Sequence, residues 1–313
     1  MRRIISPLLA LLLTACQSGT VAGFSATPWP LWPGEPPADH RLGRTEVLSL
    51  HRLQGPPAWF GGLSGAVWDG DELLAITDVG GWVRFGVTAD EAGRALAFGP
   101  LHGGRLAGIG NGKSEADAEE IERVADGLLV SFERHHRVLL YRHGLDQPPQ
   151  PLRVPAEIAR LDSNEGIETM ASLSDGRVVL IAEGQDDAAQ SPLWIGGADG
   201  WRQGQWLHHG TFRPTAAAPL PDGGMLVLER SFRLTSGAAM RLVRVTKAGL
   251  DQPMVTGEEW ALLQAPLSVD NFEALAVRPR ADGRLVATLL SDDNFNPLQS
   301  TLMLTLLLPP ILP

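Results

Sequence analysis

The chain has 313 residues, of which 44% are hydrophobic and 20% are charged, and its formal net charge at pH 7 is −10. Nucleic-acid binding needs a basic face for the phosphates, so this acidic balance excludes nucleic acid as an expected partner. The length permits a large buried core, and the 35 glycines and 24 prolines favour a turn-rich all-β protein.

Residues 1–15 have the form of a secretory signal, with two arginines, an apolar run at 7–13 and then Leu-Thr-Ala-Cys. This tetrapeptide resembles the bacterial lipobox, in which the cysteine becomes the lipidated first residue of the mature protein. Cys16 is the only cysteine, so it has no partner for an internal disulfide or a zinc site. We expect lipid attachment at Cys16, and Gln17 in place of aspartate points to the outer membrane, facing the periplasm.

Residues 16–40 are dense in proline and glycine and have no hydrophobic periodicity. Such a composition predicts a semi-extended tether between the lipid and the folded domain. The domain is then expected to span residues 41–313, to begin with an alternating strand at 45–53, and to act as a monomer.

One pattern recurs along the domain: an apolar run, an Asp-Gly step, and a second apolar run. Asp-Gly between apolar runs is a strong signal for a β-hairpin. The five predicted hairpins cover residues 63–78, 118–133, 164–184, 213–230 and 270–294. Their Asp-Gly steps are about fifty residues apart, which is the spacing of a β-propeller with one blade per repeat.

Further strands are expected between the hairpins, at 137–143, 191–197 and 240–249, where they would close the blades. The last apolar run, 300–309, is expected to pair with 45–53, so that the two ends of the chain share a blade. Five hairpins plus this shared blade predict six blades, with five or seven as alternatives. Two short helices are expected, at 155–162 and 258–266.

A propeller brings corresponding ends of its inner strands to one end of a central channel, so acids that recur there should converge. At the start of the inner strands we expect Glu120 or Glu122, Glu165, Glu168 and Glu273, with Ser64 and Thr215 at equivalent points. At the end of the returning strands we expect Asp78, Glu133, Glu183, Glu229, and Asp292 or Asp293. Carboxylates without His or Cys select a hard cation, so this pattern predicts calcium; the alternative is that each acid caps a turn or faces solvent.

Other motifs are weaker. Ser64 lies in Gly-Leu-Ser-Gly-Ala, which approaches a nucleophile elbow but lacks its last glycine, so a turn or ligand-facing hydroxyl is favoured. Residues 107–114 end like a P-loop but lack its first glycine, which favours a loop. The pairs at 135–136 and 208–209 are adjacent histidines, of which only one of each pair could face a site on a strand.

The order of several motifs resembles the phytase-like family, described as "esterase-like activity of phytase". The motifs are GLSGAVWDGDELLAITD, NEGIETMASLSDG, RPTAAAPLPDGGMLVLER, DNFEALAVRPRADG and SDDNFNPLQSTLMLTLLL, and the resemblance covers about residues 44–308. It implies a β-propeller distantly similar to calcium-dependent alkaline phytases, with Glu168, Glu183, Glu229 and Glu273 as channel acids. It also implies that Arg213 and Arg230 bind phosphate or carboxylate groups, whose geometry suits guanidinium.

These observations predict an envelope lipoprotein that hydrolyses a small anionic ester, a phosphoester before a carboxylic ester, with calcium in the channel. The expected catalytic residues are Glu168 or Glu229 as general base, with Arg230 and Arg213 on the substrate. The expected metal ligands are Asp78, Glu133, Glu165, Glu183, Glu273, Asp292 and Asp293. A metal-dependent lactonase and a ligand-binding or scaffold lipoprotein with structural calcium remain as alternatives.

Overall fold

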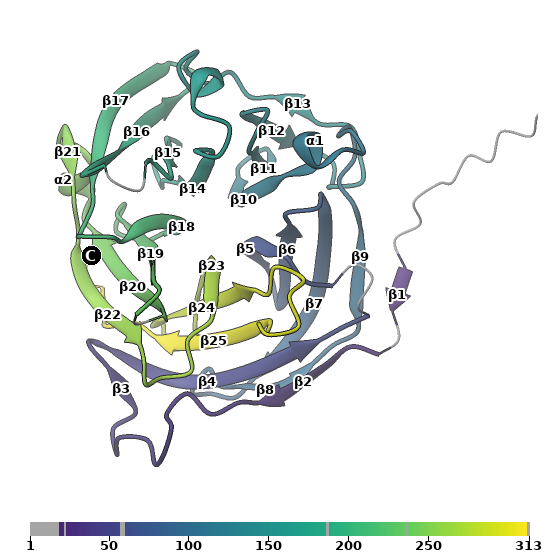
Figure 1. The fold of residues 1–313 in the computed structure, drawn as a ribbon, viewed down its shortest axis with the longest axis vertical. Coiled ribbons are helices and arrows are strands. Elements are labelled where there is room, and N and C mark those ends of the chain that lie inside the picture. Colours follow the sequence, from purple (N-terminus) through teal and green to yellow (C-terminus); the bar gives the residue numbers. More distant parts are fainter. Residues whose placement is uncertain (1–18, 22, 57–59, 186–187, 236, 312–313) are drawn as a thin grey trace, which may run out of the picture.

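The computed structural model describes residues 19–21, 23–56, 60–185, 188–235 and 237–311. Its strands form five sheets arranged in a ring around a central axis, as Figure 1 shows. The predicted all-β propeller is confirmed, but the expected six blades are wrong, because the ring has five. All five predicted hairpins are present, and each forms the two innermost strands of one blade.

From the axis outward, the first three blades start with β5, β10 and β14. Blade one contains β5 (Leu63–Asp69), β6 (Glu72–Thr77), β7 (Gly81–Ala89) and β9 (Leu101–Arg105), with β8 (Ala95–Phe98) and β1 (Gly19–Val21) at its edge. Blade two contains β10 (Ala118–Val124), β11 (Gly127–Phe132), β12 (Arg137–Tyr141) and β13 (Gln150–Pro151). Blade three contains β14 (Ile167–Ser172), β15 (Val178–Ala182), β16 (Gln190–Gly197), β17 (Gly200–Leu207) and β21 (Met254–Val255).

The last two blades start with β18 and β23. Blade four contains β18 (Arg213–Pro219), β19 (Met225–Arg233), β20 (Gly237–Val245) and β22 (Glu258–Gln264). Blade five contains β23 (Asn271–Pro279), β24 (Leu285–Asp292), β25 (Leu302–Leu307), β4 (Thr45–Gln54) and β2 (Ser25–Pro28), with β3 (Arg41–Leu42) paired to β4.

Blade five joins the two ends of the domain and explains the blade count. The strand β25 pairs antiparallel with β4, for example Leu304 with Leu50, as the sequence predicted. The fifth hairpin has only β25 after it in the chain, so it completes its sheet with β4 and β2. The shared blade is therefore the blade of the fifth hairpin and not an additional one.

The Asp-Gly steps form the turns that the sequence predicted. The glycines of four of these steps, Gly70, Gly176, Gly223 and Gly283, have φ values of 63°, 84°, 81° and 81°. This left-handed region is open to glycine at little cost, which explains why the step recurs.

The expected helix at 258–266 is wrong, because residues 258–264 form β22, whose Leu263 pairs with Met240 of β20. At 155–162 the structure has a single 3-10 turn, η1 (Ile158–Arg160), and the α-helices are short: α1 (Lys113–Ala116) and α2 (Lys247–Leu250). No helix in the described part of the chain is long and apolar enough to cross a lipid bilayer.

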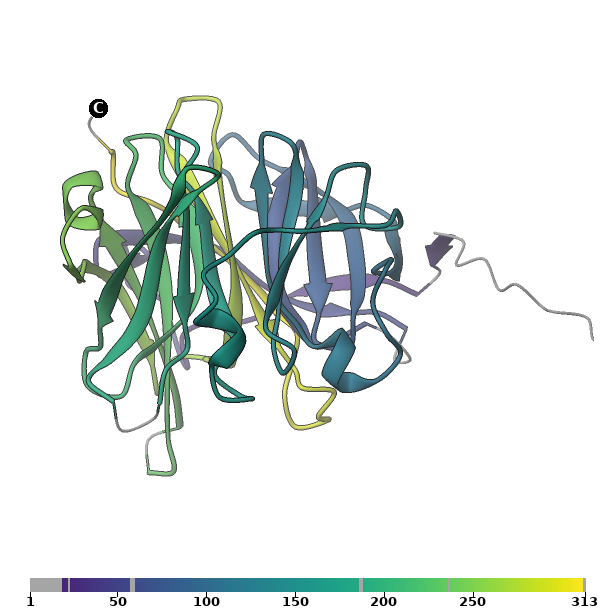
Figure 2. The same cartoon turned by 90° about the horizontal axis from the view of Figure 1, so that it is seen from above.

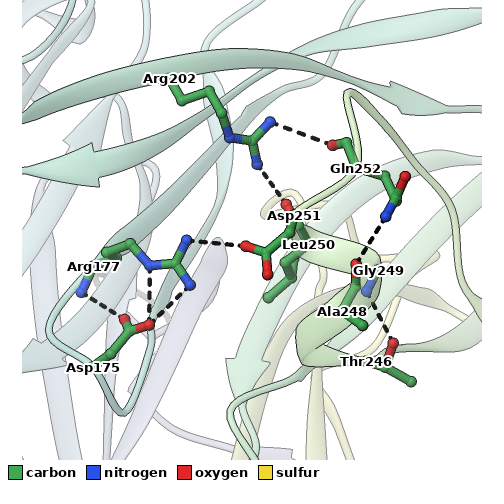
Figure 3. A network of polar contacts seen from close by, with 9 residues as sticks. All are labelled: Asp175, Arg177, Arg202, Thr246, Ala248, Gly249, Leu250, Asp251 and Gln252. Atoms are coloured by element: carbon green, nitrogen blue, oxygen red, sulfur yellow. Dashed lines mark hydrogen bonds and ion pairs between the residues drawn. The ribbon is translucent and has the colours of Figure 1, made fainter.

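The segment around α2 connects blade four to blade three. Arg177, at the turn of blade three, forms an ion pair with Asp251 at 3.4 Å, and Arg202 of β17 donates to the carbonyl oxygen of Gln252 at 3.3 Å (Figure 3). Just beyond these residues, β21 pairs with β17. The two blades are thus joined at their outer edges as well as at the axis.

The tether predicted at residues 16–40 is packed on the domain in part. The signal segment and Cys16 lie outside the described residues. Residues 25–28 form β2 on blade five, and Leu31 is buried with 3% exposure in the core between blades four and five. The proline-rich segment from Ser25 to Leu31 is therefore packed on the domain and does not act as a free tether.

Candidate metal and substrate site at the channel mouth

Each innermost strand has a β-bulge near its start. The register shifts lie between Leu63 and Gly65, Ala118 and Ile121, Ile167 and Thr169, Pro214 and Ala216, and Phe272 and Ala274. A bulge adds an unpaired residue and redirects its side chain. The residues inside the five bulges are Ser64, Glu119 with Glu120, Glu168, Thr215 and Glu273. Three blades therefore contribute carboxylates at one level of the ring.

A second level is formed where the second strand of each blade ends. The backbone N–H groups of Asp78, Glu133 and Glu183 donate to Gly62, Asp117 and Gly166 at 2.9, 2.9 and 3.1 Å. In the other two blades the equivalent pairs are Arg230 with Arg213 and Asp292 with Asn271. The five blades therefore supply Asp78, Glu133, Glu183, Arg230 and Asp292 at this level, four acids and one arginine.

Arg230 joins the two levels. Its guanidinium lies 3.1 Å from the carboxylate of Glu273 and 3.4 Å from that of Glu183, and it donates to the side chain of Asn271 at 2.9 Å. Burial acts to lower the pKa of Arg230, and the carboxylates of Glu273 and Glu183 more than offset this, so the pKa is raised. Arg230 is thus a permanently charged group at the centre of the acidic cluster.

Five acids of the cluster have raised pKa values: Asp78, Glu119, Glu133, Glu168 and Asp292. Burial is the main cause, followed by neighbouring carboxylates, and the pKa is raised to about 8 for Asp292, about 7 for Glu133 and about 6 for Asp78. For Glu168 and Glu119 the pKa is also raised well above the usual range, by burial and by other carboxylates of the cluster. More negative charge is gathered here than Arg230 neutralises, which favours either protons or a bound cation.

The donor set suits a hard cation. Asp117, Glu119 and Glu133 offer carboxylate oxygens that all lie within 4.8 Å of one another. Within the described residues, the buried Oδ1 of Asp78 has no hydrogen-bond partner, while its other oxygen lies 3.7 Å from Lys113. Calcium prefers several carboxylate oxygens in flexible geometry, and these residues provide them.

Sequence reasoning missed Asp117 and Glu119. The bulge of blade two contains two residues, Glu119 and Glu120, where the other bulges contain one. The sequence does not show this difference, and the prediction therefore named Glu120 or Glu122. Both of those carboxylates are buried; Glu120 accepts from the N–H of Ala217 across the channel at 3.4 Å, and burial raises the pKa of Glu122 to about 8. The pairing of Ala118 with Phe132, which only the structure shows, fixes the register of β10 and identifies Glu119 as a bulge residue.

Glu229 lies outside the cluster. Its fully buried carboxylate accepts from Nε1 of Trp206 at 2.9 Å and from Nε of Arg241 at 2.6 Å. Side chains alternate along a strand, so when Arg230 faces the channel mouth its neighbour Glu229 faces the opposite side. The expectation that Glu229 shares the channel with the other acids is therefore corrected.

Three more expected residues have other surroundings. Arg213 donates to the backbone carbonyl oxygens of Gln185 and Ala188, among others, and so supports the loop after β15. Asp293 accepts from the N–H groups of Gly62 and Phe295, both at 3.1 Å, and so shapes the loop between β24 and β25, which Figure 2 shows projecting from one face. Glu165 lies in the loop before β14, with intermediate exposure.

The structure also shows the surroundings of the weaker motifs, which are Ser64, residues 107–114 and the two histidine pairs. The hydroxyl of Ser64 donates to the carbonyl oxygen of Ala118 at 2.6 Å, and residues 107–114 lead into α1. His135 lies 2.7 Å from Glu115 at the surface, and Nε2 of His208 lies 2.6 Å from the hydroxyl of the buried Ser191.

Comparison with known proteins identifies a family. The sequence model of a family described as "Phytase-like: Esterase-like activity of phytase" matches residues 58–295. No curated protein matches the sequence.

Two solved structures are among those that match this chain. A PQQ-bound aldose sugar dehydrogenase from Streptomyces coelicolor is 12% identical, with a TM-score of 0.44, and the match covers 92% of this chain and 100% of that chain. A glutaminyl cyclase from Myxococcus xanthus is 13% identical, with a TM-score of 0.43, and the match covers 86% of this chain and 100% of that chain.

Proposed function

The chain belongs to the phytase-like family, and we propose that it is a calcium-dependent hydrolase of anionic esters, phosphoesters before carboxylic esters, acting at the channel mouth. One observation carries the proposal: acids from four blades interact with one another at the channel mouth, and Arg230 lies against those of blades three and five. Carboxylates for a cation and a guanidinium for an anion are the two parts that ester hydrolysis of a charged substrate needs.

Asp117, Glu119 and Glu133 would hold the calcium ion, with Asp78 beside them. When bound, the ion supplies positive charge that offsets the acids and lowers the pKa of a coordinated water. Glu119 and Glu133 would be ionised beside the ion despite their raised pKa values, because a nearby cation favours the charged form.

The protein's own groups bind and orient the substrate. Arg230 binds the anionic oxygens of the ester, since its guanidinium is held in place by Glu273 and Asn271. Glu168 accepts the proton of the attacking water, since burial and neighbouring carboxylates raise its pKa and so make the carboxylate a stronger base. The new bond joins the water oxygen to the phosphorus or carbonyl carbon of the ester, the bond from that atom to the alkoxy oxygen breaks, and the leaving alkoxide takes a proton from solvent.

The cellular setting remains part of the proposal. Lipid attachment at Cys16 would place the domain on a membrane of the bacterial envelope, where its substrates would be small anionic esters outside the cytoplasm. Labelling the expressed protein with a radioactive fatty acid, with Cys16→Ser as the control, tests this; incorporation that persists in the variant would exclude lipidation at Cys16.

The activity is tested by assaying the purified chain with p-nitrophenyl phosphate, p-nitrophenyl acetate and δ-valerolactone, with calcium and with EDTA. We expect turnover of the phosphate ester that EDTA abolishes and calcium restores. Glu119→Gln should lower kcat/KM by about 100-fold or more, as loss of metal ligation or of a transition-state contact does. The exposed Glu157→Gln is the matched control.

Two results would change the assignment. Turnover of the lactone alone would make the protein a lactonase. A melting temperature that falls with EDTA, without turnover of any of the three substrates, would make the calcium structural and the protein a scaffold.

A further inference from the structure

A separate cavity of about 370 Å³ lies between blades one and two. It is lined by Leu74 of β6, Trp82 and Arg84 of β7, His102 of β9, and Leu128 and Leu145 of blade two. On β6 the mouth of the channel is near Thr77, so this cavity lies farther along the blade, toward its outer strands. Its volume is within the range of about 300–1,000 Å³ that small-molecule sites occupy.

The strand register builds one wall of the cavity. Leu74, Arg84 and His102 are directly opposed on three neighbouring strands, and Trp82 is opposed to Gly104 in the next row. A Cβ atom at Gly104 would lie 3.1 Å from Cε2, Cζ2 and Nε1 of Trp82, so one face of the indole rests on this glycine. The other face of the indole is therefore turned away from the sheet, toward the cavity that it lines.

Two donors on this wall are unused. Within the described residues, Nε1 of Trp82 and Nε of Arg84 are buried and have no hydrogen-bond partner. The terminal nitrogens of Arg84 are occupied, at 3.4 Å from Asp69 and 3.4 Å from Glu72. A buried donor without a partner is unfavourable, so a ligand whose acceptors reach these two N–H groups gains binding energy here.

Hydrogen-bond acceptors in the same cavity restrict the charge of the ligand. The carboxylates of Glu72 and Asp146 also line it, and they repel an anion, because Arg84 is already paired. A cation would leave the two N–H donors unpaired. A hydroxyl both accepts from N–H groups and donates to carboxylates, so several hydroxyls on one molecule match this wall.

We propose that this cavity binds a saccharide. The negative face of an indole attracts the polarised C–H bonds on the apolar face of a sugar ring, while hydroxyls at the ring edge pair with the donors and carboxylates. Trp82 is the platform, Arg84 and Asp146 are the polar contacts, and Leu128 and Leu145 close the opposite side. The site is independent of calcium and of the acids at the channel mouth.

The test is isothermal titration of the purified chain with glucose, galactose, N-acetylglucosamine, maltotriose, cellotriose and chitotriose, and with citrate and choline as an anion and a cation. We expect at least one saccharide to bind, with the same Kd in EDTA as in calcium, and no binding of citrate or choline. Trp82→Ala should weaken saccharide binding at least tenfold. Trp201→Ala is the matched control, because Trp201 is a half-buried tryptophan of β17 in blade three, remote from the cavity.

Asp146→Ala keeps the proposal testable if Trp82→Ala does not fold, because Asp146 is exposed in a loop and its removal leaves the core intact. It should weaken binding several-fold with an unchanged melting temperature. Absence of binding by all six saccharides, binding of citrate or choline instead, or equal affinity of Trp82→Ala and the unaltered chain would each overturn the proposal. Retained ester hydrolysis in Trp82→Ala would show that the two sites are separate.

Discussion

Glu229 and Arg230 are consecutive residues of β19 with opposite surroundings. Glu229 is fully buried against Trp206 and Arg241, and Arg230 faces the acids of the channel mouth. The acids at the ends of the second strands led to the prediction that Glu229 lies in the channel. In the strand register, however, the residues equivalent to Glu229 in the other blades are Thr77, Phe132, Ala182 and Ser291. Neighbouring residues of a strand point to opposite faces. Glu229 therefore stabilises the fold, while Arg230 belongs to the candidate site.

At this scale the first prediction concerns Arg230. Arg230→Met should lower kcat/KM for p-nitrophenyl phosphate by about 100-fold or more, because the cation that pairs with Glu273 and Glu183 is removed from the substrate's position. Steady-state kinetics would measure it, with Arg160→Met, on η1, as the surface control. Unchanged kinetics would remove Arg230 from the site.

The second residue-scale prediction concerns Glu229. Glu229→Gln should destabilise the fold by about 3–5 kcal/mol, the usual cost of removing one partner from a buried ion pair, because the buried Arg241 keeps only its longer ion pair with Glu259, at 3.7 Å. Urea unfolding would measure the change. At a temperature where the variant is folded, we expect its kcat/KM to stay near that of the unaltered chain; a loss comparable to that of Arg230→Met would return Glu229 to the catalytic residues.

Among the elements, β2 and the residues that follow it differ most between the prediction from sequence and the structure. Proline and glycine density predicted a tether, yet β2 pairs with β4 and Leu31 enters the core between blades four and five. A short strand at the edge of blade five also covers the backbone groups that β4 would otherwise expose.

Leu31→Ala should therefore lower the free energy of unfolding by about 2–5 kcal/mol, the range for a leucine truncated in a packed core. Thermal or urea unfolding would show it. Glu35→Ala, four residues later and exposed, should have no measurable effect. If Leu31→Ala were equally silent, this segment would be a tether after all.

For the whole molecule, the acidic channel makes stability depend on pH. The pKa is raised to about 6, 7 and 8 for Asp78, Glu133 and Asp292, so in this range the folded protein binds more protons than the unfolded chain. Stability is then fully present below the unfolded pKa values, near 4, and is lost as pH rises toward 8.

In EDTA we therefore expect the melting temperature to fall between pH 5 and pH 8. Calcium should raise the melting temperature more at pH 8 than at pH 5, because protons and the ion compete for the same carboxylates. Differential scanning calorimetry at several pH values, with magnesium as a comparison ion, measures both effects. A melting temperature that rises with pH in EDTA would contradict the arrangement of the acids.

The sequence by itself determined the hairpins, the all-β propeller and the family, because Asp-Gly turns and alternating apolar runs are local signals that repeat about every fifty residues. It also placed Glu168, Glu183, Glu273 and Arg230 on the inner strands. These properties depend on neighbours along the chain, which a sequence displays directly.

Only the tertiary structure decided the number of blades, the packing of Ser25 to Leu31, and the members of the acidic cluster. Blade five is completed by strands from both ends of the chain. Glu119 enters the cluster through a bulge with two residues where other blades have one, and Asp117 lies just before β10. The cavity at Trp82 likewise forms between two blades. Such features depend on strand register and on contacts between distant segments, and a change of one residue in register moves a side chain to the other face.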